Sequence, residues 1–123
     1  MLNRILVVDD DPMWREAVSR AVADCGYMAV TADGVAEAMA WLQQQEFVLV
    51  ITDNYMPYAN EGVELLQYMD RAMKKPVPTI LQSSTYPSNL KLILETFPWV
   101  SFLKKQDRGD LEWLMRHLKG RMN

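Results

Sequence analysis

The chain has little of several residues that would decide its class at once. Its 123 residues include one cysteine, Cys25, and one histidine, His117. A single cysteine excludes an internal disulfide bond, which fits a reducing compartment. The formal net charge is only −3, so no bulk electrostatic attraction to nucleic acid or to an anionic membrane is expected.

Long apolar runs are missing as well. The first apolar stretch, residues 5–8, is short and ends in acidic residues, which is too short for a signal peptide or a membrane span. No internal repeat, low-complexity segment or change of composition marks a linker. We therefore expect a cytoplasmic protein with a single domain over residues 1–123.

The most informative stretch is residues 47–53, FVLVITD. An apolar run of this kind is typical of a strand that is buried on both faces of a parallel sheet. Pro57 follows and prevents the strand from continuing. In open α/β sheets, chemistry takes place just beyond the carboxyl ends of the strands, so Asp53 is placed like a reactive group. A simple turn-capping role for Asp53 is the alternative that this stretch alone leaves open.

Strand-like and helix-like segments alternate along the whole chain. We predict strands at residues 5–8, 27–31, 47–53, 77–82 and 99–103. We predict helices that begin after the N-caps Asp11 and Asp33, and others over 62–75, 90–97 and from Asp107 onward. This alternation predicts a parallel sheet covered by helices on both faces. Right-handed crossovers favour the flavodoxin-like, doubly wound strand order 2-1-3-4-5.

Under that order, polar groups from four separated segments converge at the carboxyl ends of the strands: Asp9, Asp10, Asp53, Ser83 and Lys105. Carboxylates that are crowded together repel one another unless a cation neutralises them. A few oxygen ligands, with room for water and a phosphate, suit Mg²⁺. Phosphoryl transfer needs such a metal, a further cation and an aligned nucleophile, and an aspartate can be that nucleophile by forming an acyl phosphate.

These residues also carry a resemblance to a known family. The chain resembles, over essentially its whole length, the receiver (response regulatory) domain of bacterial two-component response regulators, in particular the single-domain chemotaxis regulators. The resemblance rests on five segments: residues 8–12 (VDDDP), Asp53 with Met56-Pro57, Gly62, Ser83, and residues 102–105 (FLKK).

The resemblance implies a role for each site residue. Asp53 would be the phosphoacceptor, and a histidine kinase or a phosphotransfer protein would donate the phosphoryl group. The metal Mg²⁺ would lie at Asp9, Asp10, Asp53 and the backbone carbonyl of Tyr55, with Asp10 binding it directly and Asp9 largely through water. In addition, Lys105 would pair with one phosphoryl oxygen, Ser83 would donate a hydrogen bond to another, and Phe102 would be the switch aromatic that turns inward when Ser83 moves.

The implied protein is a phosphoaccepting signalling switch and not a classical enzyme, although it would catalyse its own phosphorylation and dephosphorylation. The implied output surface consists of the fourth helix, the fifth strand and the fifth helix, which would contact a downstream protein or a second copy of the chain. Residues 90–99 contain more large apolar side chains than one buried stripe requires, which is typical of a contact surface. Direct binding to nucleic acid or to a membrane is not expected of this domain.

Four positions depart from the family pattern. Gln106 replaces the usual proline after the lysine, the loop over residues 57–62 is one residue longer, Ser83 replaces the commoner threonine, and residues 97–99 (FPW) replace small residues. The first and last departures bear on the geometry of switching. Cys25 and His117 are more simply explained as a core residue and as a solvated or packing residue.

Two other functions are compatible with parts of the pattern. A pseudo-receiver would keep the fold as a phosphorylation-independent interaction module, but the joint presence of Asp9, Asp10, Asp53, Ser83 and Lys105 argues against it. A phosphatase with an aspartyl nucleophile usually has a second acid two residues later, where this chain has Tyr55.

Overall fold

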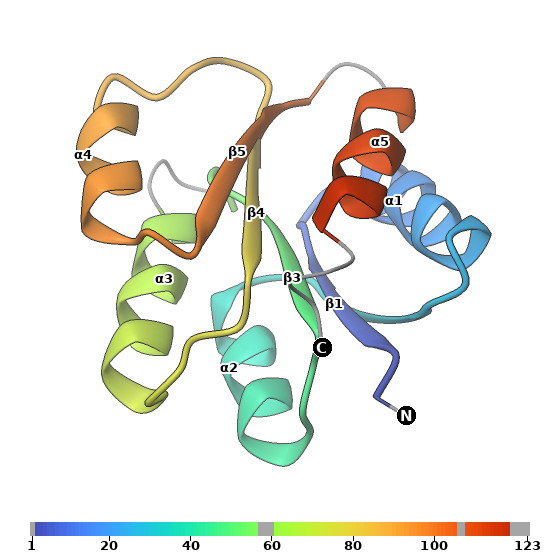
Figure 1. Ribbon diagram of the computed structural model, residues 1–123, viewed down its shortest axis with the longest axis horizontal. Helices are drawn as coiled ribbons and strands as arrows, with labels where there is room; N and C mark the ends of the chain where they lie inside the picture. Colours follow the sequence, from blue (N-terminus) through green and yellow to red (C-terminus); the bar gives the residue numbers. More distant parts are fainter. Residues whose placement is uncertain (1, 57–60, 106–107, 119–123) are drawn as a thin grey trace.

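The computed structural model describes residues 2–56, 61–105 and 108–118. Strands and helices alternate along the chain (Figure 1). The strands are β1 (Arg4–Val8), β2 (Met28–Ala32), β3 (Leu49–Asp53), β4 (Thr79–Ser83) and β5 (Val100–Lys104). The helices are α1 (Pro12–Asp24), α2 (Val35–Gln44), α3 (Glu61–Ala72), α4 (Leu90–Thr96) and α5 (Arg108–Leu118).

The five strands form one parallel sheet in the order β2-β1-β3-β4-β5, which confirms the predicted topology. The register places Asp53 beside Gln82 and Ser83 beside Lys104. The carboxyl ends of β3, β4 and β5 are therefore level, and the side chains that follow them share one edge of the sheet.

Helices cover both faces of the sheet. The helices α1 and α5 pack on one face, and α2, α3 and α4 lie on the other (Figure 1). All five residues of β3 are buried, as the apolar run predicts for a central strand. Burial on both faces fixes the position of Asp53, because the strand that carries it has no freedom to shift against its neighbours.

The predicted N-cap Asp11 is confirmed, whereas two other predicted helix ends are wrong. The helix predicted over 62–75 runs over Glu61–Ala72. The Asp11 carboxylate accepts the backbone N–H of Met13 at 3.0 Å and caps α1. At α2, however, the N-cap is Gly34 and not Asp33. The Glu37 carboxylate accepts the backbone N–H of Asp33 at 3.1 Å. The side-chain acceptor at this end of α2 therefore belongs to a residue of the helix itself and not to the predicted N-cap.

Strand boundaries differ from the predictions by one or two residues. The predicted strand over 77–82 runs over Thr79–Ser83, because Pro78 has no N–H to donate to a sheet ladder. Similarly, Phe47 and Val48 are buried but precede β3.

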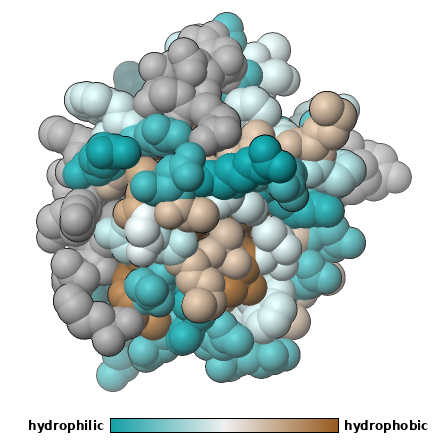
Figure 2. Space-filling view, turned by 90° about the vertical axis from the view of Figure 1, so that its right-hand side faces the viewer, coloured by the Kyte–Doolittle hydropathy of each residue, from teal (hydrophilic) through white to brown (hydrophobic). Residues whose placement is uncertain are grey.

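The face that lies to the right in Figure 1 is mixed in polarity. Figure 2 shows the side of the molecule that lies to the right in Figure 1, where hydrophilic side chains surround a small apolar area. Within the described part of the chain, no helix has the length and apolar character that crossing a membrane requires.

Candidate functional site

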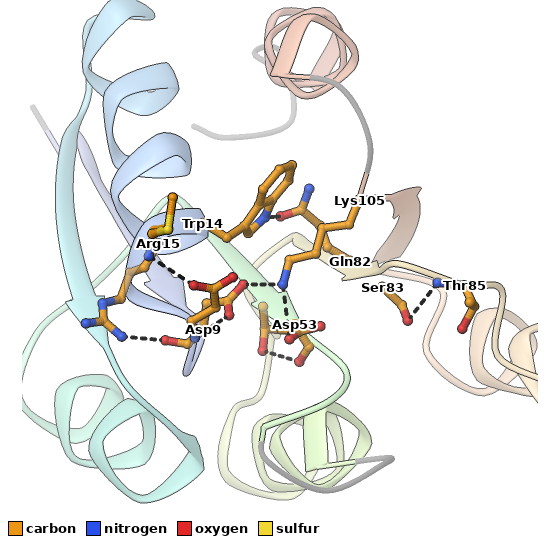
Figure 3. Close-up of polar contacts among 11 residues, drawn as sticks. Asp9, Trp14, Arg15, Asp53, Gln82, Ser83, Thr85 and Lys105 are labelled. Atoms are coloured by element: carbon orange, nitrogen blue, oxygen red, sulfur yellow. Dashed lines mark hydrogen bonds and ion pairs between the residues drawn. The ribbon is translucent and has the colours of Figure 1, made fainter.

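The candidate site lies at the carboxyl edge of the sheet and draws on four strands. Asp9 directly follows β1, Asp53 is the last residue of β3, Ser83 is the last residue of β4, and Lys105 directly follows β5. Figure 3 shows that the side chains of Asp9, Asp53 and Lys105 point toward one another. The structure thus brings together residues that are far apart in the sequence.

The Lys105 ammonium group bridges two carboxylates. Its Nζ lies 2.7 Å from Oδ2 of Asp9 and 3.2 Å from Oδ2 of Asp53. Both acids are almost fully enclosed, with exposed fractions of 2% for Asp9 and 6% for Asp53. The ammonium is therefore held between two buried negative groups, and its shorter contact is with Asp9.

Burial and the neighbouring charges shift the pKa values of all three groups. Burial raises the pKa of Asp53 above its ordinary value, and the nearby charge of Asp9 raises it further, although Lys105 opposes the shift. Burial likewise raises the pKa of Asp9, against the hydrogen bond from Lys105. For Lys105, burial lowers the pKa, but the contacts with Asp9 and Asp53 raise it by more, so the pKa lies above its ordinary value. A single lysine thus offsets only part of the cost of two buried carboxylates.

The backbone around Asp9 is fixed by two further hydrogen bonds. The second carboxylate oxygen of Asp9 accepts the backbone N–H of Asp11 at 2.9 Å. The guanidinium of Arg15 donates to the Asp9 backbone carbonyl at 2.7 Å. These contacts hold the turn between β1 and α1, and they leave Asp10 exposed at the mouth of the site.

Three carboxylates could together hold a metal ion. One oxygen from each of Asp9, Asp10 and Asp53 lies within 4.8 Å of the other two. All three ligand atoms are oxygens, and one acid is open to solvent, so the set fits a hard divalent cation that keeps some of its waters. Tyr55 is exposed, and its backbone N–H donates to the Asp53 carboxylate.

Gly62 allows the close approach of α3 to the end of β3. A Cβ atom at this position would lie 2.5 Å from the backbone oxygen of Asp53 and 2.8 Å from Cα of Asn54. The Gly62 N–H donates to the Asn54 carbonyl at 3.2 Å. Glycine at this position therefore helps to fix the backbone that carries Asp53.

Ser83 and Phe102 lie on the β4–β5 side of the site. Ser83 is buried, and its hydroxyl oxygen accepts the backbone N–H of Thr85 at 3.4 Å. Phe102 is half-buried, and its ring centroid lies 5.4 Å from that of Tyr86. The Lys104 ammonium lies 5.5 Å from the same Tyr86 ring. Tyr86 therefore connects the segment after β4 to the face of β5.

Residues 5–114 match the family model of the response regulator receiver domain. The chain belongs to this family. Together with the sheet order, the match confirms the resemblance inferred from the motifs.

Individual relatives agree with this assignment. The chain is 31% identical over 110 residues to the DNA-binding transcriptional regulator NtrC of a Bradyrhizobium strain, a match that covers 89% of this chain and 20% of that protein. A receiver protein structure from Pseudomonas putida is 31% identical, with a TM-score of 0.81, and the match covers 95% of this chain and 98% of that one. A response regulator from Thermotoga maritima, solved in complex with Mg²⁺ and BeF, is 25% identical, with a TM-score of 0.80 and coverage of 99% of this chain and 100% of that one.

The chain spans only a small part of the curated relatives it matches, between 11% and 20% of their length. What those whole proteins do is therefore not carried over with the receiver domain.

The sequence patterns did not single out three residues that contact the candidate site. These are Trp14 and Arg15 on α1 and Gln82 on β4. One signal was visible for Gln82, which is a polar residue at the end of an apolar strand. Trp14 follows the apolar spacing of its helix, and nothing in that spacing indicates a contact with a residue 68 positions away.

Part of the predicted departure from the family lies outside the described residues. This applies to Gln106, to residues 57–60 of the longer loop predicted over 57–62, and also to the side chain of His117. In contrast, the structure does place residues 97–99, where the Phe97 and Trp99 rings meet edge to face with centroids 5.5 Å apart.

Proposed function

We propose that this receiver domain is a phosphoaccepting switch in which Asp53 is the phosphoacceptor. An Asp53 carboxylate oxygen forms a bond to phosphorus while the bond between phosphorus and the donor atom breaks, and the donor keeps that electron pair. The donor is the phosphohistidine of a histidine kinase or of a phosphotransfer protein. Hydrolysis of the acyl phosphate by water then returns Asp53 to its free state.

The observation that carries the proposal is the Lys105 ammonium between Asp9 and Asp53. A phosphoryl group on Asp53 brings new anionic oxygens to a place where a half-buried cation already lies 3.2 Å from the Asp53 carboxylate. The ammonium can pair with one of these oxygens with little movement, and the charge that develops during transfer is stabilised by a group that is already in position.

The three acids supply the remaining part of the site. Asp9, Asp10 and Asp53, with the Tyr55 carbonyl, would hold Mg²⁺, and their clustered oxygens support this assignment. When bound, Mg²⁺ neutralises the oxygens of the transferring phosphoryl group and of the acceptor. Burial and then the charge of Asp9 raise the pKa of Asp53, and such a cation relieves the repulsion between the two carboxylates.

We further propose that the switch acts through the surface formed by α4, β5 and α5, where a downstream protein or a second copy of the chain binds. Ser83 would donate a hydrogen bond to a phosphoryl oxygen, and Phe102 would turn inward in response. Two exposed apolar side chains near this surface, Tyr86 and Leu92, support the assignment. The contact of Tyr86 with Phe102 links that surface to β5.

Intact-mass measurement tests the chemistry. Incubated with acetyl phosphate and Mg²⁺, the wild-type protein should gain the mass of one phosphoryl group, and Asp53→Asn should gain none. Asp70→Asn, on the exposed side of α3, is the matched control and should be labelled like the wild type.

Two results would contradict the proposal. Labelling of Asp53→Asn at the wild-type rate would place the acceptor on another residue. Failure to label the wild type with acetyl phosphate and with a phosphorylated kinase would favour the pseudo-receiver.

A further inference from the structure

Two side chains with no part in the proposed transfer lie beside Lys105. The indole Nε1 of Trp14 donates a hydrogen bond to Oε1 of Gln82 at 3.3 Å. The Lys105 Nζ lies over the Trp14 ring, 5.5 Å from its centroid. In Figure 3 the Lys105 side chain runs past both residues on its way to Asp9 and Asp53.

Gln82 is polar in a place where an apolar residue would be expected. Its exposed fraction is 2%, and its Nε2 has no hydrogen-bond partner among the described residues. A buried donor without a partner destabilises a fold, and replacing it with an apolar group of similar shape removes that penalty. The remaining contribution of the side chain is its Oε1, which holds the indole of Trp14.

The Trp14 indole gives the Lys105 ammonium a rigid packing surface with favourable electrostatic potential. The indole packs against the buried cluster formed by α1, α5 and the sheet, and its N–H is tied to Gln82. The face of an indole ring carries negative potential and attracts an ammonium group. Two of the three Lys105 N–H directions go to Asp9 and Asp53, and the ring borders the ammonium on a further side.

We propose that Trp14 and Gln82 are positioning residues for Lys105. Gln82 sets the orientation of the indole, and the indole keeps the Lys105 ammonium over the gap between Asp9 and Asp53. The inference rests on the proposed function, because that function gives the ammonium an incoming phosphoryl oxygen to meet. Because the indole already restricts the Lys105 side chain, that side chain loses less conformational entropy when a phosphoryl oxygen binds to it.

The geometry can be tested in the metal-free protein by NMR. The ε-methylene protons of Lys105 should be shifted upfield by the ring current of Trp14. Gln82→Met should reduce this shift because the indole is released, and Trp14→Leu should abolish it. Trp41→Phe, on α2, is the control and should leave the shift unchanged. Wild-type protein without the upfield shift, or a shift that Gln82→Met leaves unaltered, would overturn the inference whatever the protein does with phosphate.

The consequence can be tested by calorimetric titration with beryllofluoride in the presence of Mg²⁺. Gln82→Met and Trp14→Leu should each weaken binding roughly tenfold, within the range measured for residues in contact. The same substitutions in a Lys105→Met background should have no further effect, because the lysine through which they act is absent. Equal losses in both backgrounds would show a general structural role and overturn the inference.

The NMR test and the beryllofluoride titration together distinguish a failure of this inference from a failure of the proposed function. Wild-type protein that shows the upfield shift but binds no beryllofluoride would contradict the proposed function and retain the lysine geometry. Should Trp14→Leu fail to fold, Gln82→Met still decides both tests. It removes the unpaired buried Nε2 and also the acceptor of the part-buried Trp14 N–H, so the two effects oppose each other and the variant is expected to unfold at a denaturant concentration close to that of the wild type.

Discussion

At the scale of single residues, Gly62 has the least room for a side chain among the glycines in the described part of the chain. A methyl group there would meet two backbone atoms, the Asp53 oxygen at 2.5 Å and the Asn54 Cα at 2.8 Å. Neither atom is at the end of a flexible side chain, so α3 or β3 would have to move. We expect Gly62→Ala to lower the free energy of unfolding by about 1–3 kcal/mol, as overpacking does elsewhere, and urea denaturation would measure the loss.

Gly34→Ala is the matched control for this substitution. Apart from its own helix and chain neighbours, a Cβ atom at Gly34 meets no heavy atom of the described residues within 4 Å, and the extended backbone there suits any residue. Because Gly34 is the N-cap of α2, where alanine is less favourable than glycine, the free energy of unfolding should fall by no more than about 1 kcal/mol. Equal losses at both positions would mean that the close approach at Asp53 is not what requires glycine.

The contribution of Asp53 to the free energy of unfolding should depend on pH in the acidic range. Burial and the charge of Asp9 raise the pKa of Asp53 above 3.8 in the folded protein, so the folded state binds more protons than the unfolded state just above that pH. The contribution of Asp53 to stability is therefore greatest below its unfolded pKa, and it is lost as pH rises through its folded pKa. Lys105 does not titrate in this window, because its pKa lies above 10.5.

Asp53→Asn cannot ionise, so in EDTA it should become more stable relative to the wild type as the pH is raised from acidic values toward neutral. Asp70→Asn, at an exposed position, should show no such trend. Urea denaturation at a series of pH values measures both variants. Parallel stability profiles for wild type and Asp53→Asn would show that ionisation of Asp53 does not strain the metal-free fold.

At the scale of elements, neighbouring residues of α4 differ sharply in burial. Ile93 is buried with Leu66 and Phe97, whereas the neighbouring Leu92 is 64% exposed. We expect Ile93→Ala to lower the free energy of unfolding by about 2–5 kcal/mol. Leu92→Ala should change it by about 0.5 kcal/mol or less. Chemical denaturation compares the two, and similar losses would mean that Leu92 packs inside the protein in solution.

The elements were predictable to the extent that their signals are local. Apolar runs, helix spacing and stop residues identified the five strands and five helices, because burial on both faces and capping act within a few residues. Asp33 illustrates the limit. It has a good N-cap side chain, but Gly34 takes that position and Glu37 supplies the hydrogen bond. Two competing caps one residue apart cannot be ranked by residue type alone.

The sequence predicted which residues lie close together at the candidate site, but not which of them contact one another. Parallel strands in a known order bring their carboxyl ends together, which is enough to collect Asp9, Asp53 and Lys105 at one edge. The order does not say which carboxylate the lysine prefers, and the structure places it closer to Asp9. Nor does it pair Trp14 with Gln82, since that contact depends on how two side chains on α1 and β4 are oriented.

At the scale of the whole molecule, α4 and the segment before it have the features of a region that opens easily. The N-cap residue Asn89 makes no side-chain capping hydrogen bond, and Ile93 is the one buried residue of this helix. A short helix with few buried side chains has low local stability. The same segment connects Ser83 to the Tyr86–Phe102 contact, so under the proposed function a change at Asp53 would be passed to it through Ser83.

Amide hydrogen exchange should therefore change mainly over residues 84–105 when beryllofluoride and Mg²⁺ are added. Tyr86 meets both the Phe102 ring and the Lys104 ammonium, so an inward turn of Phe102 must break the first contact and alter how the chain before α4 packs. The helix α2, which lies against β1 and β2 away from β5, is the internal control and should exchange at an unchanged rate.

The variant Leu92→Glu should keep the exchange response, because Leu92 is exposed, but lose any self-association or partner binding that the response produces. Identical exchange over residues 84–105 with and without bound beryllofluoride would place the output of the switch elsewhere on the molecule.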